Sequence, residues 1–156
     1  MSKSLARVRA ALEAAGATTQ IRETDDRART AAGAAEVVGC EVDQIAKSII
    51  FRGEESGHIV LFLTAGGNRV DSGKAAEVAG QDLGKADADQ IRAETGFAIG
   101  GVAPVGHLQR IEAYIDPRLT EFPEVWAAAG TPRHLFSISP QELIRITGAR
   151  MAEFTE

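Results

Sequence analysis

The sequence predicts a single α+β domain built around a mixed β-sheet. Strand-like and helix-like segments alternate along the 156 residues, and at least one pair of strands forms a hairpin, which argues against a purely parallel, doubly wound sheet. Apolar residues make up 44% of the chain and charged residues 25%, as in an ordinary globular protein. We therefore expect one domain, residues 1–156, with a core of mostly small aliphatic side chains.

Several helices and strands can be assigned from periodicity and from capping residues. Apolar residues recur at helical spacing from Leu5 to Ala15, with Ser4 as the candidate N-cap and Gly16 as the stop. Three more helices are expected at 72–78, 87–95 and 139–147, and another that Thr30 caps and that runs to Val38. The remaining strands are expected at 18–23, 110–116, 125–129 and 134–138.

The clearest strand signal is a hairpin of residues 46–52 and 58–64. Alternation places Lys47 on one face with Ile49 and Phe51, at the beginning of the first strand. A lysine there either extends its ammonium past the rim of the sheet or points into a pocket where burial makes its charge matter. The pattern leaves both interpretations open.

Charge and cysteine content exclude several classes of protein. The net charge of −5 argues against a protein that grips long nucleic acid, including DNA, through many phosphates, but it allows a short nucleic-acid end to enter a pocket. Lys3, Arg7 and Arg9 lie on the first expected helix and are interpreted as a solvated surface, with a basic patch that meets a polyanion as the alternative. Cys40 is the only cysteine and reads as a small core residue, so no intrachain disulfide is expected. With no membrane-length apolar run and no signal-peptide pattern, the expected location is the cytoplasm, away from membranes.

The stretch from Gly96 to His107, GFAIGGVAPVGH, combines four glycines with apolar residues and Pro104. Glycine lets the backbone approach a ligand closely, and proline stiffens the chain. Such a segment is typical of a rigid, partly buried backbone whose N–H groups face a carbonyl oxygen, an oxyanion or a phosphate. A tight crossover between two core strands is the structural alternative.

The motifs of the common hydrolase and nucleotide-binding sites do not occur. The chain contains no GxxxxGK[ST], no GxSxG, no HExxH and no paired-cysteine zinc spacing. No metal or other cofactor is therefore expected. Catalysis, where it occurs, must use positioning, backbone donors and a lysine.

Taken together, several of these segments resemble the YbaK/EbsC family, which also occurs as the editing insertion domain of bacterial prolyl-tRNA synthetases. The likeness spans AKSIIF with Lys47, VDSGKAAEVAG, TGFAIGGVAPVGH, RIEAYID and SPQELIRITGA. Its most specific part is the GxxxP motif, present as Gly100 to Pro104. The resemblance implies a barrel-like mixed sheet surrounded by helices. It also implies hydrolysis of the ester that joins a wrong amino acid to the 3′ end of a tRNA, typically the tRNA for proline.

The resemblance also implies where the site lies. Lys47 and Gly100 are the expected catalytic positions, because an ammonium and bare amides can stabilise the developing oxyanion. The expected substrate-binding positions are Ser48, Gly101, Val102, Ala103, Pro104, Gly130, Thr131 and His134.

One departure affects the specificity that the resemblance can carry over. Where YbaK itself has an acidic residue on the late strand, this chain has Leu135. Selectivity for Cys is therefore not carried over, and Ala, Ser or Thr is equally compatible.

The expected partner is the 3′ end of a mischarged aminoacyl-tRNA, with prolyl-tRNA synthetase as a candidate second partner. Two other functions stay open at this point. One is a non-catalytic module that binds tRNA or a synthetase, and the other is hydrolysis of a small ester or thioester unrelated to RNA.

Overall fold

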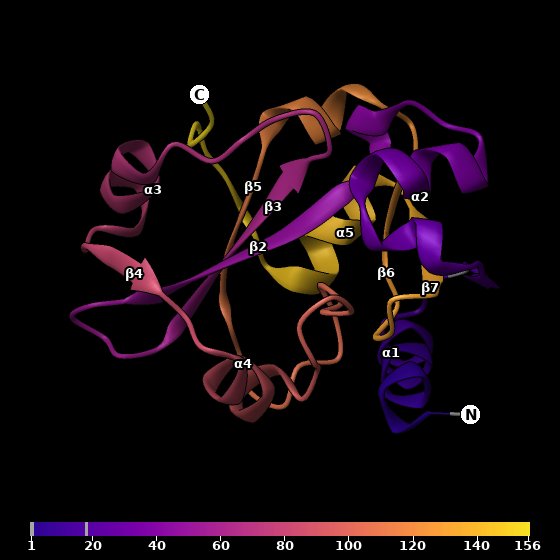
Figure 1. The fold of residues 1–156 in the computed structure, drawn as a ribbon, viewed down its shortest axis with the longest axis horizontal. Helices are drawn as coiled ribbons and strands as arrows, with labels where there is room; N and C mark the ends of the chain where they lie inside the picture. Colours follow the sequence, from indigo (N-terminus) through magenta and orange to yellow (C-terminus); the bar gives the residue numbers. More distant parts are fainter. Residues whose placement is uncertain (1, 18) are drawn as a thin grey trace.

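The computed structural model describes residues 2–17 and 19–156 and shows two β-sheets with helices packed around them (Figure 1). Over those residues the chain forms five α-helices and three 3-10 helices. The α-helices are α1 (Lys3–Ala14), α2 (Ala31–Val38), α3 (Ser72–Ala79), α4 (Ala88–Thr95) and α5 (Pro140–Thr147). The 3-10 helices are η1 (Asp26–Arg29), η2 (Val42–Gln44) and η3 (Pro117–Glu121).

The larger sheet has five strands in the order β4-β2-β3-β5-β8. Their bounds are β2 (Ala46–Gly53), β3 (Ile59–Ala65), β4 (Leu83–Lys85), β5 (Glu112–Ile115) and β8 (Arg150–Met151). The β2–β3 hairpin is antiparallel, whereas β3 pairs with β5 in parallel, so the sheet is mixed as predicted. The smaller sheet has the order β1-β7-β6, with β1 (Ile21–Glu23), β6 (Val125–Ala128) and β7 (His134–Ile138).

The expected barrel-like closure is not confirmed, because the two sheets do not join into a closed barrel. In the part of the chain that the structure describes, an isolated parallel bridge between Ile45 and Trp126 links the end of β2 to β6. Strand β4 covers only the far end of β2, pairing with Phe51–Gly53. The middle of β2 therefore keeps an edge that no described strand pairs with, and this edge becomes important at the site.

Both faces of the larger sheet are covered, so its central strand is buried throughout. Leu61 and Leu63 face the main core, whereas Val60 and Phe62 face a second cluster. Phe62 makes an edge contact with the Phe154 ring near the C-terminus, at 4.9 Å between centroids. This C-terminal covering explains why the strand predicted to be half-buried at 110–116 buries residues on both of its faces.

Most helix boundaries agree with their predicted caps. Thr30, Asp87 and Ser139 each accept a hydrogen bond from the backbone of their helix, and glycines in left-handed conformation end these three helices. The first helix differs, because Ser2 rather than Ser4 caps it and accepts from the Leu5 amide at 3.0 Å.

The strand predictions were less complete than the helix predictions. Strand β1 is confirmed only over its last residues; Thr18, in the predicted range, lies outside the described residues. Strands β4 and β8 were missed because two or three residues carry no measurable period.

Two expectations about membranes and thiol chemistry can also be compared with the structure. Over residues 2–17 and 19–156, no helix has both the length and the apolar character needed to span a bilayer.

Cys40 is half-buried and packs beside the cluster around Ala34 and Leu135. Burial raises the pKa of the Cys40 thiol, with the charges of Glu124 and Glu41 adding to the effect. The thiol therefore lacks the electropositive surroundings of a reactive cysteine.

Candidate active site

A cavity of about 470 Å³ opens beside the unpaired edge of β2. Five parts of the chain enclose it: β2, the η1–α2 junction, the end of β4 with the start of α4, the glycine-rich segment and β6. The site residues predicted from the sequence that line it are Lys47, Ser48, Gly100 and Val102. The structure thus brings the predicted lysine and part of the predicted glycine segment to one cavity.

Lys47 is half-buried at the start of β2, opposite Thr64 of β3. Its Nζ donates a hydrogen bond to the Asn68 carbonyl oxygen at 2.7 Å. Burial lowers the pKa of Lys47, and the positive charge of Arg69 lowers it further, whereas Asp116 and Asp43 act in the opposite direction. This hydrogen bond orients the ammonium. It holds the ammonium against the turn after β3, and this turn lies beside the cavity lining.

A network of carboxylates holds the turn that carries the Asn68 carbonyl. Asp116 is buried, and its Oδ2 accepts from the Ala65 amide at 3.1 Å and from Asn68 Nδ2 at 2.9 Å. Asp43 Oδ1 accepts from the Gly67 amide at 2.8 Å. Asp116, Asp43 and Asn68 were not predicted from the sequence as site residues. Their signal was weak, since each is a lone polar residue next to a strand or a turn.

The glycine-rich segment, residues 96–107, is irregular backbone and not part of a sheet ladder. Residues 101–105 are buried, whereas Gly100 is exposed at the cavity with a φ of +96°. The Gly101 amide donates to the Ala98 carbonyl at 3.2 Å. For the amides of Gly100, Val102 and Ala103, no acceptor is found within residues 2–17 and 19–156. The expectation of a partly buried backbone is confirmed. The alternative of a crossover between two core strands is not, because the segment connects α4 to β5.

Arg7 of α1 holds both ends of the glycine-rich segment. Its Nη2 donates to the Gly96 carbonyl at 2.6 Å, and its guanidinium carbon lies 4.7 Å from the centre of the Phe97 ring. A Cβ on Gly106 would lie 3.3 Å from the Arg7 carbonyl oxygen, so α1 packs directly on this backbone as well. The interpretation of Arg7 as solvated surface was therefore wrong. A lone arginine on an amphipathic helix does not reveal that a distant loop needs a donor.

The turn of residues 130–134 lies directly behind the glycine-rich segment. A Cβ on Gly101 would lie only 2.8 Å from the Thr131 backbone, so the two backbones are in contact. The Thr131 hydroxyl and His134 Nδ1 are 2.7 Å apart, and His134 Nε2 lies 3.4 Å from Glu23 Oε2.

The side chains of this turn face a second cavity, of about 580 Å³, which also contacts α1. Thr131 and His134 line this second cavity, whereas Gly130, Gly101, Ala103 and Pro104 are buried behind the two cavities. Arg29 lines both cavities. The predicted site residues therefore fall into three groups. Lys47, Ser48, Gly100 and Val102 line the first cavity, Thr131 and His134 line the second, and the other four are buried behind both.

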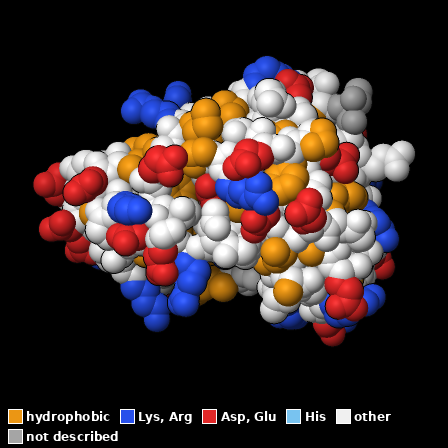
Figure 2. Space-filling model, turned by 90° about the horizontal axis from the view of Figure 1, so that it is seen from above, with side chains coloured by type: hydrophobic (Ala, Val, Ile, Leu, Met, Phe, Trp, Pro, Cys, Tyr) orange, Lys and Arg blue, Asp and Glu red, His pale blue; other side chains and the backbone are white. Residues whose placement is uncertain are grey.

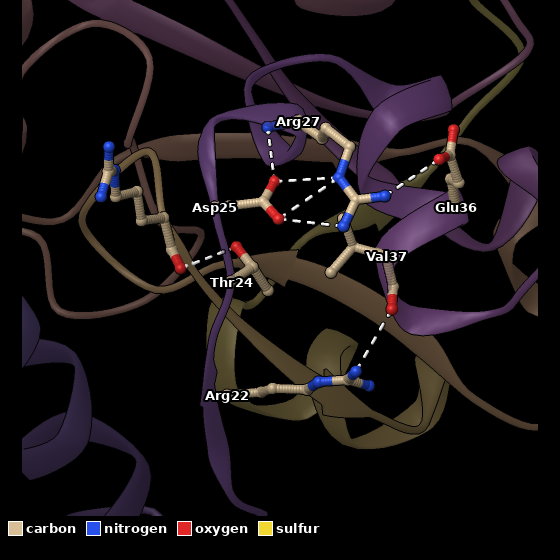
Figure 3. Close-up of polar contacts among 7 residues, drawn as sticks. Arg22, Thr24, Asp25, Arg27, Glu36 and Val37 are labelled. Carbon is tan, nitrogen blue, oxygen red and sulfur yellow. Dashed lines mark hydrogen bonds and ion pairs between the residues drawn. The ribbon is translucent and has the colours of Figure 1, made fainter.

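The opposite wall of the first cavity is the η1–α2 junction, which ion pairs on the surface hold in place (Figure 3). Arg27 lies between two carboxylates, with Nη2 at 2.9 Å from Asp25 Oδ2 and Nη1 at 2.9 Å from Glu36 Oε1. Arg22 of β1 donates to the Val37 carbonyl at 3.2 Å. The Arg22 bond ties the end of α2 to β1, and Arg27 ties η1, which carries cavity-lining residues, to the same end of α2.

The cavity has a distinctive charge pattern. Its lining carries three cationic side chains and no carboxylate. The cations are Arg29, Lys47 and Lys85. Acidic side chains gather instead at the end of the molecule formed by the β2–β3 turn and β4 (Figure 2), where Glu54, Glu55 and Asp82 are exposed. This arrangement favours an anionic or electron-rich ligand at the cavity.

The sequence profile of the aminoacyl-tRNA editing domain matches residues 25–146. This range includes all residues that line the first cavity, but not α1, which contacts the second cavity. The chain belongs to this family. The prediction of an editing enzyme that deacylates aminoacyl-tRNA is confirmed at this level.

Three relatives illustrate the similarity. YwhH of Bacillus subtilis (strain 168) is 32% identical over 123 residues, which cover 79% of this chain and 78% of YwhH. A protein of Enterococcus faecalis (strain ATCC 700802 / V583), named "Putative Cys-tRNA(Pro)/Cys-tRNA(Cys) deacylase EbsC", is 24% identical over 127 residues, 81% of this chain and 77% of its own. A crystal structure of "a putative trans-editing enzyme for prolyl tRNA synthetase" has a TM-score of 0.93 at 48% identity, covering 100% of this chain and 99% of that one.

Proposed function

We propose that this chain is a trans-editing deacylase that hydrolyses the ester of a small amino acid wrongly attached to the tRNA for proline. The observation that carries the proposal is the cavity where Lys47, Gly100 and Val102 meet. An aminoacyl ester is already reactive, so a placed water and donors for the developing oxyanion suffice, without a catalytic triad.

The amides of the glycine-rich segment support its role as the hydrogen-bond donor to the oxyanion. The amides of Gly100 and Val102 belong to lining residues, and neither has an acceptor within the described chain. One such donor is typically worth about 100–1000-fold in rate. Arg7 and the 130–134 turn hold this backbone from behind, which is the preorganisation that such a donor needs.

The contacts of Lys47 support its role as the cation that binds the terminal ribose or the ester carbonyl. Its pKa is lowered, but Asp116 and Asp43 lie close enough to favour the charged form, and Nζ donates to the Asn68 carbonyl. We assign Lys47 the ammonium form, because a lysine whose Nζ bonds a carbonyl and whose ligand is a polyanion gains from staying charged.

The apolar character of the cavity lining supports a small, uncharged amino acid. Alanines from four parts of the chain line the cavity together with Ile45, Ile50 and Ile91. These alanines are Ala28, Ala31, Ala46, Ala86 and Ala128. No charged acceptor for a polar side chain is present in the lining, so alanine and other small uncharged side chains fit this surface best.

A deacylation panel tests the proposal. The tRNA for proline, charged with Ala, Ser, Thr, Cys or Pro, is incubated with the wild type, with Lys47→Ala and with Lys74→Ala. We expect hydrolysis of at least one small mischarged ester and a loss of about 100-fold with Lys47→Ala. Lys74 is the matched control, because its Nζ also donates to a backbone carbonyl, that of Thr155 at 2.9 Å, but at α3.

Two results would refute the proposal. Binding of tRNA without deacylation of any substrate would identify a non-catalytic module. Equal turnover of an aminoacyl ester with and without its tRNA would identify a hydrolase of small esters.

A further inference from the structure

The unpaired edge of β2 contributes backbone groups to the cavity. Strand β2 pairs with β3 along its whole length, but β4 covers only Phe51–Gly53 and the bridge to β6 reaches only Ile45. The residues between these contacts, 46–50, all line the cavity. A strand edge left open in this way offers amides and carbonyls to a ligand.

The hydrogen bonds of β3 show which residues of β2 direct their backbone N–H and C=O groups away from β3, toward the open edge. The Ile59 amide donates to Glu94 Oε1, the Ala65 amide donates to Asp116 Oδ2, and the Leu63 carbonyl accepts from the Asp116 amide. Residues 59, 63 and 65, and by alternation residue 61, therefore direct their backbone groups away from β2, whereas residues 60, 62 and 64 direct theirs toward it.

The alternation of an antiparallel pair then orients Ser48. Because Phe62 and Thr64 face β2, their partners Ile49 and Lys47 form the hydrogen-bonded pairs of the ladder. Ser48 lies between those two residues, opposite Leu63, so its own N–H and C=O point to the other edge. On that edge, within residues 2–17 and 19–156, no strand pairs with Ser48, and the cavity lies there.

Because no carboxylate among the described residues lines the cavity, an amine that enters it must find its acceptor among uncharged groups. An aminoacyl ester carries an α-amino group, whose N–H donors need an acceptor once they leave water. The lining offers no carboxylate, so its acceptors are backbone carbonyls and the hydroxyls of Thr30 and Ser48. The alternation directs the carbonyls of Ala46, Ser48 and Ile50 to this edge, and Ser48 is the central one, midway between the bridge at Ile45 and the pairing with β4.

We propose that the Ser48 backbone carbonyl accepts a hydrogen bond from the α-amino group of the substrate, so that the site requires a free amine. The inference rests on the proposed deacylase function. An N-acyl group removes a donor from this amine and places extra atoms against a strand edge. The site then discriminates mischarged aminoacyl-tRNA from esters whose nitrogen is already acylated.

The test compares alanyl-tRNA with N-acetyl-alanyl-tRNA by their kcat/KM values. We expect the acetylated ester to react at least about 10-fold more slowly, because the acetyl group against the strand edge keeps the one remaining N–H from the carbonyl and leaves this buried acceptor unpaired. Ser48→Ala keeps the backbone carbonyl, so the ratio between the two esters should persist in this variant. Equal rates for the two esters, or a ratio that disappears in Ser48→Ala, would overturn the inference.

A second measurement separates this inference from the deacylase proposal. Hydrolysis of both esters at one rate refutes only the amine requirement, whereas hydrolysis of neither refutes the proposed function. In that case, calorimetric binding of the non-hydrolysable 3′-alanylamino-3′-deoxyadenosine is compared with that of its N-acetyl form. Binding of the acetylated form that is at least about 10-fold weaker supports the amine requirement, and equal binding overturns it.

Discussion

The two walls of the cavity are held by different kinds of interaction. The glycine-rich segment is buried over residues 101–105 and contacts Arg7 from α1 and Thr131 from the turn before β7. The η1–α2 wall lies at the surface, where Asp25, Arg27 and Glu36 form exposed ion pairs (Figure 3). Buried backbone contacts resist displacement, whereas exposed ion pairs are screened by salt and contribute little. We therefore expect the glycine-rich wall to resist displacement more than the η1–α2 wall.

The largest effect is expected from Gly101→Ala in the rigid wall. The new Cβ would lie 2.8 Å from the backbone of Thr131, which cannot rotate away, so the amides of the segment must shift. A shift of roughly 1 Å can reduce the rate about 100-fold, and we expect a fall of this size in deacylation.

Gly73→Ala is the control for this substitution. Its Cβ meets only the Asp71 side chain at 3.3 Å, inside the first turn of α3. Full activity of Gly101→Ala would show that the contact with Thr131 does not position the site.

An intermediate effect is expected from Arg7→Ala, measured as the free energy of unfolding. The substitution removes the charge-assisted bond to the Gly96 carbonyl and the contact with the Phe97 ring. Together these are worth about 2–3 kcal/mol, or a fall in Tm of roughly 5–10 °C. Arg9→Ala, exposed on the same helix, is the control. If both variants lose the same small amount, Arg7 does not hold the loop.

The smallest effect is expected from Asp25→Asn in the exposed wall. Hydrogen bonds from Arg27 lower the pKa of Asp25 to about 2. Because this lies below the value of about 3.9 in the unfolded chain, the ionised side chain stabilises the fold above about pH 4, and the contribution is lost as the pH falls toward about 2.

Thermal unfolding at several pH values measures this contribution. The Tm of the wild type should exceed that of Asp25→Asn at neutral pH, by less than the Arg7→Ala effect, and the two should converge near about pH 2 or in about 1 M salt. A difference that stays constant across this range would mean that the ion pair does not hold the wall.

The sequence was informative wherever a property is local. Helix caps at Thr30, Asp87 and Ser139 were predicted because one side chain and the next turn suffice to form them. The β2–β3 hairpin was predicted from its alternation, and the glycine-rich segment from its composition. The positions that line the cavity, Lys47, Ser48, Gly100 and Val102, came from a resemblance together with these local patterns.

Contacts between distant segments could not be predicted in the same way. Arg7 and Gly96 are 89 residues apart, and Asp116 and Asn68 are 48 residues apart, so no spacing rule connects them. The same holds for Thr131 and His134, which pack behind the glycine-rich segment but face a different cavity.

By itself, the sequence determined that this protein has a mixed sheet, where most of its helices begin and end, and that it carries a strand-end lysine and a glycine-rich segment. Only the tertiary structure decided which groups meet, that the half-buried Arg7 contacts the glycine-rich segment, and that the edge of β2 at Ser48 stays open. The physical reason is that caps and hairpins depend on neighbours along the chain. A cavity instead depends on how five separate segments pack, and the orientation of Ser48 depends on the hydrogen bonds of the strand beside it.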